Sequence, residues 1–330
     1  MKIIANGRNA GIDILKFLAV LLITNSHMEP LYGEYSKLAT GGAIGDALFF
    51  FCSGFTLLMK PMSSAGGFLN WYKRRINRIY PTVFAVAIIS CLIWDHHFDI
   101  ISIIVEGGGW FVQCIMVYYI LLYFIGYYLK QKVLWIISLT SLACFIWYFL
   151  MGGDVSGGVY GWGYFRWLVF LNFMLLGAYM GSEEKNMKER ERNFVKDFAF
   201  AFGGIIIFYM FFIFLPQNES LRFLEVFSFI PLLVAVYYLY HWGNNPKMNK
   251  LLNHPQIYFL IRFIGGLCLE IYLIQGYFLT DLFNMIFPLN LLMIFLVIVI
   301  SAYVTRCLAR TLSQTCKDEP YDIKKIVALF

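Results

Sequence analysis

Long apolar runs separated by short polar segments recur along the whole chain. Each run is about 17–24 residues long, enough to cross ~30 Å of hydrocarbon as a helix. Hydrocarbon leaves unpaired backbone groups unsatisfied, so such runs predict helices, and the alternating ~10-residue segments of a membrane barrel are missing from the pattern. The sequence predicts an all-α, polytopic transmembrane helical bundle. Its ten expected spans are 11–28, 43–59, 79–95, 110–129, 133–151, 162–181, 197–215, 224–242, 257–280 and 286–305.

Composition strengthens this prediction and excludes a separate soluble domain. Hydrophobic residues make up 60% of the 330 residues and charged residues only 14%, against about 25% charged in soluble domains. The first run contains Asp13 and Lys16 and has no small-residue cleavage site, so it is expected to be a retained span rather than a signal peptide. We expect a membrane domain over residues 1–310 and a cytoplasmic C-terminal tail over 311–330.

The distribution of the positive charges predicts an orientation. The net charge is +6, and cytoplasmic loops are enriched in Lys and Arg. With both termini in the cytoplasm, 21 of the 26 Lys and Arg residues lie in cytoplasmic segments: Lys2, Arg8, Lys60, Lys73, Arg74, Arg75, Arg78, Lys130, Lys132, Lys185, Lys188, Arg190, Arg192, Lys196, Lys247, Lys250, Arg306, Arg310, Lys317, Lys324 and Lys325. This asymmetry requires an even number of spans. The orientation in the lipid bilayer thus accounts for the excess of positive charge, so no nucleic-acid partner is expected.

Other patterns narrow the function classes. The seven cysteines form no C-x-x-C pair, which favours packing roles over a metal site or a disulfide framework. We expect no metal. The charged segment Ser182–Lys196 is interpreted as a solvated cytoplasmic helix or loop. The two halves show no repeat and no matching Gly/Pro interruptions, which argues against an inverted-repeat transporter with broken helices.

The first span carries ionisable groups that hydrocarbon disfavours. Asp13 and Lys16 are three residues apart, close enough for an ion pair on one helix face. His27 follows Lys16 by eleven residues, which returns it to nearly the same face about 16 Å along the helix. His27 is either an interfacial residue or a general base, because its ordinary pKa near ~6.5 suits proton transfer from a hydroxyl. Asp46 or Glu29 is a candidate to orient it.

A basic cluster immediately precedes the third predicted span. The segment from Trp71 to Pro81 contains four positive charges. One interpretation is a topological anchor against anionic headgroups. The other is an anion site, because Arg75 and Arg78 project to one helix face and guanidinium groups fit phosphate oxygens.

Polar residues interrupt the ninth predicted span. They are Arg262, Glu270, Tyr272 and Gln275. A carboxylate in mid-span needs a partner or a proton, so Glu270 either forms a structural pair with Arg262 or Lys16 or takes part in catalysis.

Several of these strings together resemble the acyltransferase-3 family of integral membrane acyltransferases, which modify bacterial surface glycans and other hydroxyl acceptors. The first span resembles a D-x-x-R-x-x-A start with a histidine eleven residues after the basic position. The sequence FFFCSGF at 49–55 is similar to an F-F-x-x-S-G-F segment, and 75–81 to an R-x-x-R motif. Further similarities are 109–111, 173–181 and GGLCLEIYLIQ at 265–275. Two positions depart from the pattern: Lys16 replaces an arginine, and Gln275 stands where histidine is common.

The resemblance implies transfer of an acyl group, usually acetyl, from acyl-CoA to a hydroxyl of a glycan or lipid-linked saccharide at a bacterial inner membrane. It implies His27 as catalytic base, Lys16, Arg75 and Arg78 as donor-binding residues, and a site next to polysaccharide biosynthesis or export machinery. Supporting residues would be Asp13, Ser53, Glu270 and Gln275, with Ser53 as one candidate to steady the oxyanion. The alternatives are a transporter or flippase, or a non-catalytic partner in polysaccharide export.

Overall fold

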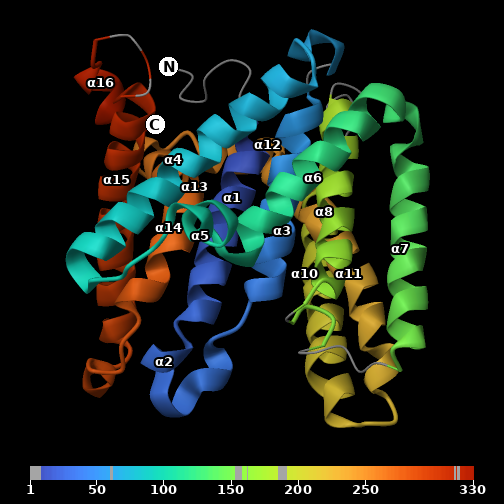
Figure 1. Ribbon diagram of the computed structural model, residues 1–330. Helices are drawn as coiled ribbons and strands as arrows, with labels where there is room; N and C mark the ends of the chain where they lie inside the picture. Colours follow the sequence, from blue (N-terminus) through green and yellow to red (C-terminus); the bar gives the residue numbers. More distant parts are fainter. Residues whose placement is uncertain are drawn as a thin grey trace. The chain divides into compact units, whose positions relative to one another are not determined.

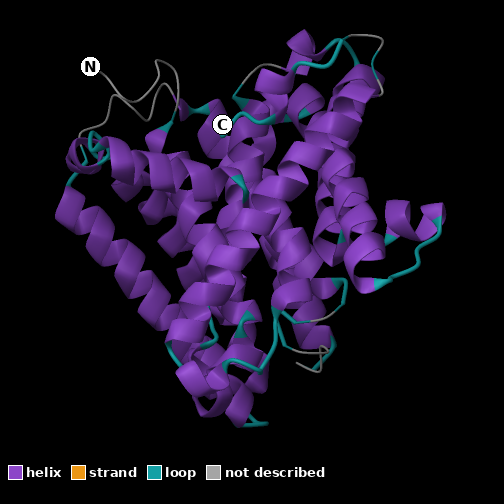
Figure 2. Cartoon of the chain, turned by 90° about the vertical axis from the view of Figure 1, so that its left-hand side faces the viewer, coloured by secondary structure: helices purple, strands orange, loops and turns teal. Residues whose placement is uncertain are grey.

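The described part of the chain consists of helices and loops and contains no strand (Figure 2). The computed structural model describes residues 9–59, 62–152, 158–161, 163–184, 192–315, 317 and 320–330. The predicted all-α class is therefore confirmed. Residues 185–191 of the predicted charged segment Ser182–Lys196 lie outside the described residues.

Long helices follow the predicted runs closely (Figure 1). Eight described helices are long and apolar enough to cross a membrane, and two bent helix pairs raise the number to ten if each pair is one span. The ten predicted spans are the upper end of this range. The long helices are α1 (Ala10–His27), α3 (Gly42–Leu58), α4 (Phe68–Trp94), α6 (Gly109–Tyr128), α7 (Val133–Leu150), α8 (Phe165–Ser182), α10 (Phe194–Phe214), α11 (Phe229–Gly243) and α15 (Leu289–Thr315).

Shorter helices connect the long ones or share a span with them. They are α2 (Glu29–Tyr32), α5 (Ile100–Val105), α12 (Pro246–Leu251), α13 (Pro255–Gly266), α14 (Cys268–Ile274) and α16 (Ile323–Ile326). The segment Glu29–Leu38 meets α3 at 105°, and α13 meets the segment Cys268–Phe278 at 54°.

Two expectations need correction. The ninth run is broken at Leu267 rather than continuous, so the expected absence of broken helices is wrong. The third span begins at Phe68 rather than at residue 79, and the basic cluster is part of its helix. Hydropathy locates the end of an apolar run, whereas backbone hydrogen bonding carries the helix on through charged residues.

The chain divides into two compact units. The first comprises Met1–Lys16, Asp46–Ser64 and Leu121–Phe259, and the second comprises Phe17–Gly45, Ala65–Ile120 and Leu260–Phe330. The boundaries cut through α1, α3, α6 and α13, so each of these helices contributes to both units.

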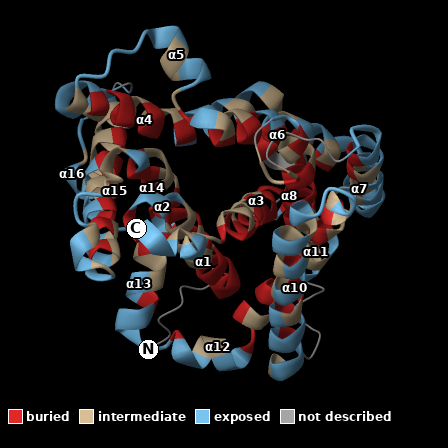
Figure 3. Ribbon diagram, turned by 90° about the horizontal axis from the view of Figure 1, so that it is seen from below, coloured by how far each residue is buried: buried red, intermediate tan, exposed pale blue. Residues whose placement is uncertain are grey.

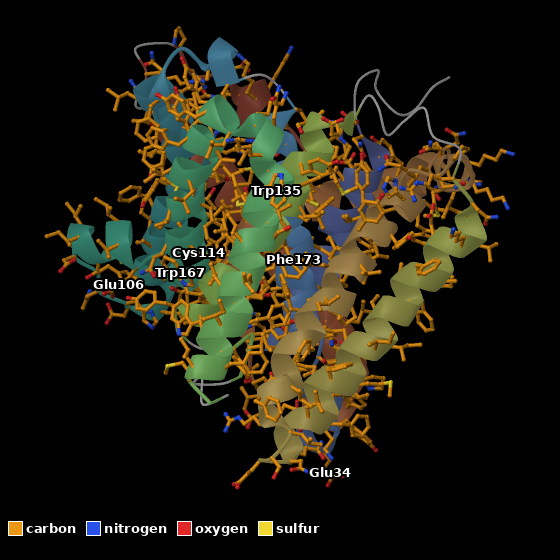
Figure 4. All side chains as sticks on the ribbon, turned by 90° about the vertical axis from the view of Figure 1, so that its right-hand side faces the viewer. Glu34, Glu106, Cys114, Trp135, Trp167 and Phe173 are labelled. Carbon is orange, nitrogen blue, oxygen red and sulfur yellow. The ribbon has the colours of Figure 1, made fainter. Side chains whose placement is uncertain are left out.

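In the first unit, glycines allow the backbones of α3 and α8 to approach closely. A Cβ added at Gly54 would overlap the Met174 carbonyl oxygen, and one at Gly177 would overlap the Phe51 carbonyl oxygen. Close backbone approach at small residues is typical of helix packing in membranes. Figure 4 labels Phe173, which is fully buried on α8, and Trp135, which is 73% exposed on α7.

In the second unit, α4 and α14 both pack on α15. The last two turns of α1 pack on a glycine-rich segment: a Cβ at Gly45 would lie 2.6 Å from Ile23 Cγ1, and one at Gly42 would lie 2.7 Å from Ser26 Oγ. Figure 3 shows buried residues concentrated along α1 and exposed residues along α5 and the end of α4. The segment that ends in His27 is therefore held by tight packing.

We predict that Gly54→Ala destabilises the protein, because the added methyl group must push α3 away from the α8 backbone. Overpacking of this kind costs about 1–3 kcal/mol. The measurement is the melting temperature of the detergent-purified protein. Gly203→Ala on α10 is the matched control: a Cβ there meets nothing within 4 Å, so higher helix propensity predicts an unchanged or slightly raised melting temperature. Equal melting temperatures for Gly54→Ala and wild type would contradict the packing interpretation.

Candidate active site

His27 is the last residue of α1, at a sharp turn of the chain that side-chain hydrogen bonds hold in place. Asn25 donates from Nδ2 to the carbonyl oxygens of Leu38 and Thr40, at 2.9 Å each, and accepts a hydrogen bond from the Tyr32 hydroxyl. Met28 is buried directly after it, whereas His27 itself is exposed. The backbone that carries His27 is thus anchored, while its imidazole is accessible.

The His27 ring faces Tyr272 of α14. The ring centroids are 6.3 Å apart and the planes are nearly perpendicular, at 75°. Phe111 of α6 also packs on Tyr272, with its ring centroid 5.0 Å from the Tyr272 ring. A Cβ at Gly109, where α6 begins with φ +60°, would lie 3.8 Å from the Tyr272 hydroxyl. Three segments far apart in the sequence therefore meet within the second unit.

A buried ion pair stabilises the break between α13 and α14. Arg306 of α15 donates from Nε and Nη2 to the two carboxylate oxygens of Glu270, at 3.0 and 2.9 Å. Both side chains are only 10% exposed. Arg306 Nη2 also donates to the Gly266 carbonyl oxygen, which lies at the end of α13 where the helix stops. One guanidinium thus neutralises the carboxylate and satisfies a carbonyl group at the break, as irregular backbone inside a membrane requires.

The expected partners of Glu270 are therefore corrected. The carboxylate pairs with Arg306 and not with Arg262 or Lys16, because α14 packs on α15. Arg262 instead places its guanidinium 4.0 Å from the centre of the Phe330 ring.

Gln275 comes directly after α14 and is buried. Its side chain is 2% exposed, and among the described residues no donor lies within hydrogen-bond distance of its Oε1. A buried acceptor without a partner costs about 1–3 kcal/mol. Such an oxygen, three residues after Tyr272, is a candidate contact for a bound molecule.

The basic cluster lies on the second and third turns of α4. The Arg75 guanidinium stacks over Trp71 at 5.0 Å and over Tyr119 of α6 at 6.0 Å. Within the described part of the chain its Nε has no hydrogen-bond acceptor. Arg78 follows three residues later on the same helix and is exposed. That the two arginines share one face of α4 stays a prediction from their spacing.

The remaining predicted site residues belong to the first unit. Asp13 is buried and accepts a hydrogen bond from the Tyr258 hydroxyl at 3.4 Å. Lys16 and Ser53 are half-buried on α1 and α3. Ser53 precedes Gly54, the glycine that contacts α8.

Residues 9–310 match the family model of the acyltransferase-3 family, which describes an acyltransferase domain. The chain belongs to the acyltransferase-3 family. No curated protein and no solved structure matches it. The match runs from α1 into α15 and so includes most of the apolar helical bundle. This family member is a multi-pass membrane acyltransferase.

Several residues that shape the site of this acyltransferase were not predicted to act there. Asn25, Arg306 and Phe111 lack any local sequence signal for their contacts, because their partners lie 7 to 161 positions away. Tyr272 had one signal, since it interrupts an apolar run. Arg306 had been interpreted only as a cytoplasmic charge, although a basic residue this close to a predicted span end can equally pair with a carboxylate inside the span.

We predict that breaking the Glu270–Arg306 pair from either side destabilises the acyltransferase. Removing one partner of a buried ion pair costs about 3–5 kcal/mol, because the other charge remains buried and unpaired. Glu270→Leu and Arg306→Leu should each lower the free energy of unfolding by about this amount, measured by denaturant titration in detergent.

The double variant tests whether the two residues act as a pair. Coupled residues show interaction energies of about 0.5–3 kcal/mol, so the double variant should be less destabilised than the two single effects added together. Lys325→Ala is the control: it removes the exposed Asp322–Lys325 ion pair of 3.0 Å and should cost at most about 1 kcal/mol. Additive single effects at Glu270 and Arg306 would contradict the pairing.

Proposed function

We propose that this acyltransferase moves an acyl group, expected to be acetyl, from cytosolic acyl-CoA to a hydroxyl of a cell-surface or exported polysaccharide. The observation that carries the proposal is the accessible imidazole of His27 on an anchored turn at one end of α1. In a membrane acyltransferase a base must meet a hydroxyl from outside the protein, and an exposed ring with fixed backbone meets that need.

His27 acts as general base in this proposal. It removes the proton from the acceptor hydroxyl while the oxygen attacks the thioester carbonyl carbon. The carbon–sulfur bond then breaks, and the imidazolium returns the proton to the departing thiolate, which leaves as free CoA. Tyr272, whose ring packs edge-on against His27, positions the imidazole.

Arg75, Arg78 and Lys16 serve the donor. The charge pattern predicts that the start of α4 is cytoplasmic, which is the side where acyl-CoA is available. Arg75 is already oriented by Trp71 and Tyr119, so less side-chain entropy is lost when it binds phosphate. Lys16 keeps the charge of the arginine usual in the family but gives up its bidentate hydrogen bonding.

The supporting residues take different roles. Glu270 holds the broken helix that presents Tyr272, through its contact with Arg306. Gln275, with its unsatisfied buried oxygen, supports acceptor binding. Ser53 follows Cys52, whose Sγ lies 3.9 Å from the Ile12 carbonyl oxygen. Ile12 is 15 residues, or about 22 Å, before His27 on α1, so the expected oxyanion role of Ser53 is not part of the proposal. Asp13 supports the N-terminal end of α1 through Tyr258.

We predict that His27→Ala lowers acyl transfer by about 10²–10⁴-fold, the usual contribution of a general base. Transfer is measured in membranes with acyl-CoA labelled in the acyl group, together with mass analysis of surface polysaccharide for an acetyl-sized change. His97→Ala is the matched control, because His97 lies in the loop after α4 with its side chain 88% exposed. Near-normal turnover of His27→Ala would overturn the role as base. Absence of transfer in the wild type would favour the transporter or non-catalytic alternative.

We predict that Arg75→Ala combined with Arg78→Ala weakens donor binding by at least tenfold, because charged hydrogen bonds contribute about 1.5–3 kcal/mol each. The measurement is the dissociation constant of acyl-CoA for the purified protein. The control replaces Lys130 and Lys132 by Ala, two exposed cations in another predicted cytoplasmic segment. If the double variant inserts normally and its affinity for acyl-CoA is unchanged, Arg75 and Arg78 serve only as a topological anchor.

A further inference from the structure

An apolar groove runs between α10 and α11 in the first unit, and no residue assigned to acyl transfer lines it. It has a volume of about 480 Å³, within the range of small-molecule sites. Only apolar residues line it: Ala199, Phe200, Gly203, Gly204, Ile207, Phe211, Phe227, Ile230, Pro231 and Val234. The two helices lie side by side (Figure 1) and both belong to candidate membrane spans. Both walls of the groove are therefore segments expected to lie in hydrocarbon.

Gly203 keeps the groove open. A Cβ at Gly204 would lie 2.8 Å from the Pro231 carbonyl oxygen, so Gly204 is needed for the close approach of α10 and α11. A Cβ at Gly203 meets nothing within 4 Å. Helix packing thus explains Gly204 but not Gly203. Glycine destabilises a helix by about 1 kcal/mol relative to alanine, so Gly203 needs another explanation. The unexplained glycine forms part of the groove wall.

Positive charge marks one end of the groove. Lys196 is exposed one turn before Phe200, and its Nζ lies 5.8 Å from the centre of that ring, which lines the groove. Lys247 is also exposed, 5.4 Å from the Phe194 ring at the start of the same helix. The nearby Asp197 is buried and paired with Arg192 at 3.5 Å. Its negative charge is therefore offset within the protein.

We propose that this groove binds one acyl chain of an anionic phospholipid, whose phosphate contacts Lys196. The apolar lining matches a hydrocarbon chain, and the cation at the mouth matches a negative headgroup. A helix from a second copy fits less well, because half-exposed Phe200, Ile207 and Ile230 flank Gly203. These side chains make a walled groove, whereas close helix dimers need a flat strip of small residues.

The test is native mass spectrometry of the purified protein with phosphatidylglycerol or phosphatidylcholine of identical chains. The wild type should retain one phosphatidylglycerol at least fivefold more tightly than phosphatidylcholine. Gly203→Leu fills the groove and should reduce the retained lipid at least fivefold. Lys196→Gln should remove the preference for phosphatidylglycerol and leave chain binding in place.

Controls separate the groove from general lipid contact and from misfolding. Phe202→Leu changes a 53% exposed residue of α10 that does not line the groove, and Lys132→Gln removes an exposed cation elsewhere; both should bind lipid as the wild type does. Melting temperatures verify that Gly203→Leu is folded, and Gly203→Ala provides a milder filling variant with an intermediate expected loss. Equal binding of both lipids by the wild type would overturn the proposal. So would lipid retention unchanged by either Gly203 variant, or a dimer that Gly203→Leu converts to monomer.

Discussion

The ion pair between Glu270 and Arg306 is the constraint on which the second unit depends. A carboxylate and a guanidinium that are each 10% exposed could not remain charged in a membrane interior without each other. Their contact spans α14 and α15, and the same guanidinium reaches the Gly266 carbonyl oxygen at the helix break. A backbone interruption that hydrocarbon would not tolerate is thereby stabilised by a single side chain.

The break determines what the following helix presents. Because α14 leaves α13 at 54°, it has its own direction, and Tyr272 on it meets both His27 and Phe111. A straight helix would continue the line of α13 instead. The Asn25 hydrogen bonds hold His27 in place, because they fix the turn that follows α1. The geometry around His27 thus results from two independent anchors, one on each side of the His27–Tyr272 contact.

Sequence reasoning recovered those features that depend on local composition. The all-helical class and the approximate limits of α1, α6, α7 and α8 follow from apolar run length, because desolvation of the backbone dictates helices there. His27 and Glu270 were singled out because ionisable groups in spans are costly. Their partners were not predictable in the same way. The choice of Arg306 over Arg262 is a matter of which helices pack together, and no periodicity in the chain encodes that choice.

The family motifs divide into those that pack and those that could act chemically. The segment FFFCSGF supplies Gly54 and the Phe51 carbonyl oxygen to the contact with α8, and the segment 173–181 supplies Met174 and Gly177 to the same contact. These two motifs therefore have a sufficient explanation in helix packing. Glu270 likewise has both carboxylate oxygens engaged by Arg306, so a proton taken up there would weaken the pair that holds the break. His27 differs from all of these, because its ring is exposed and its backbone alone is fixed. In the proposed mechanism, proton transfer is for this reason assigned to His27, and Glu270 acts on it only through the placement of Tyr272.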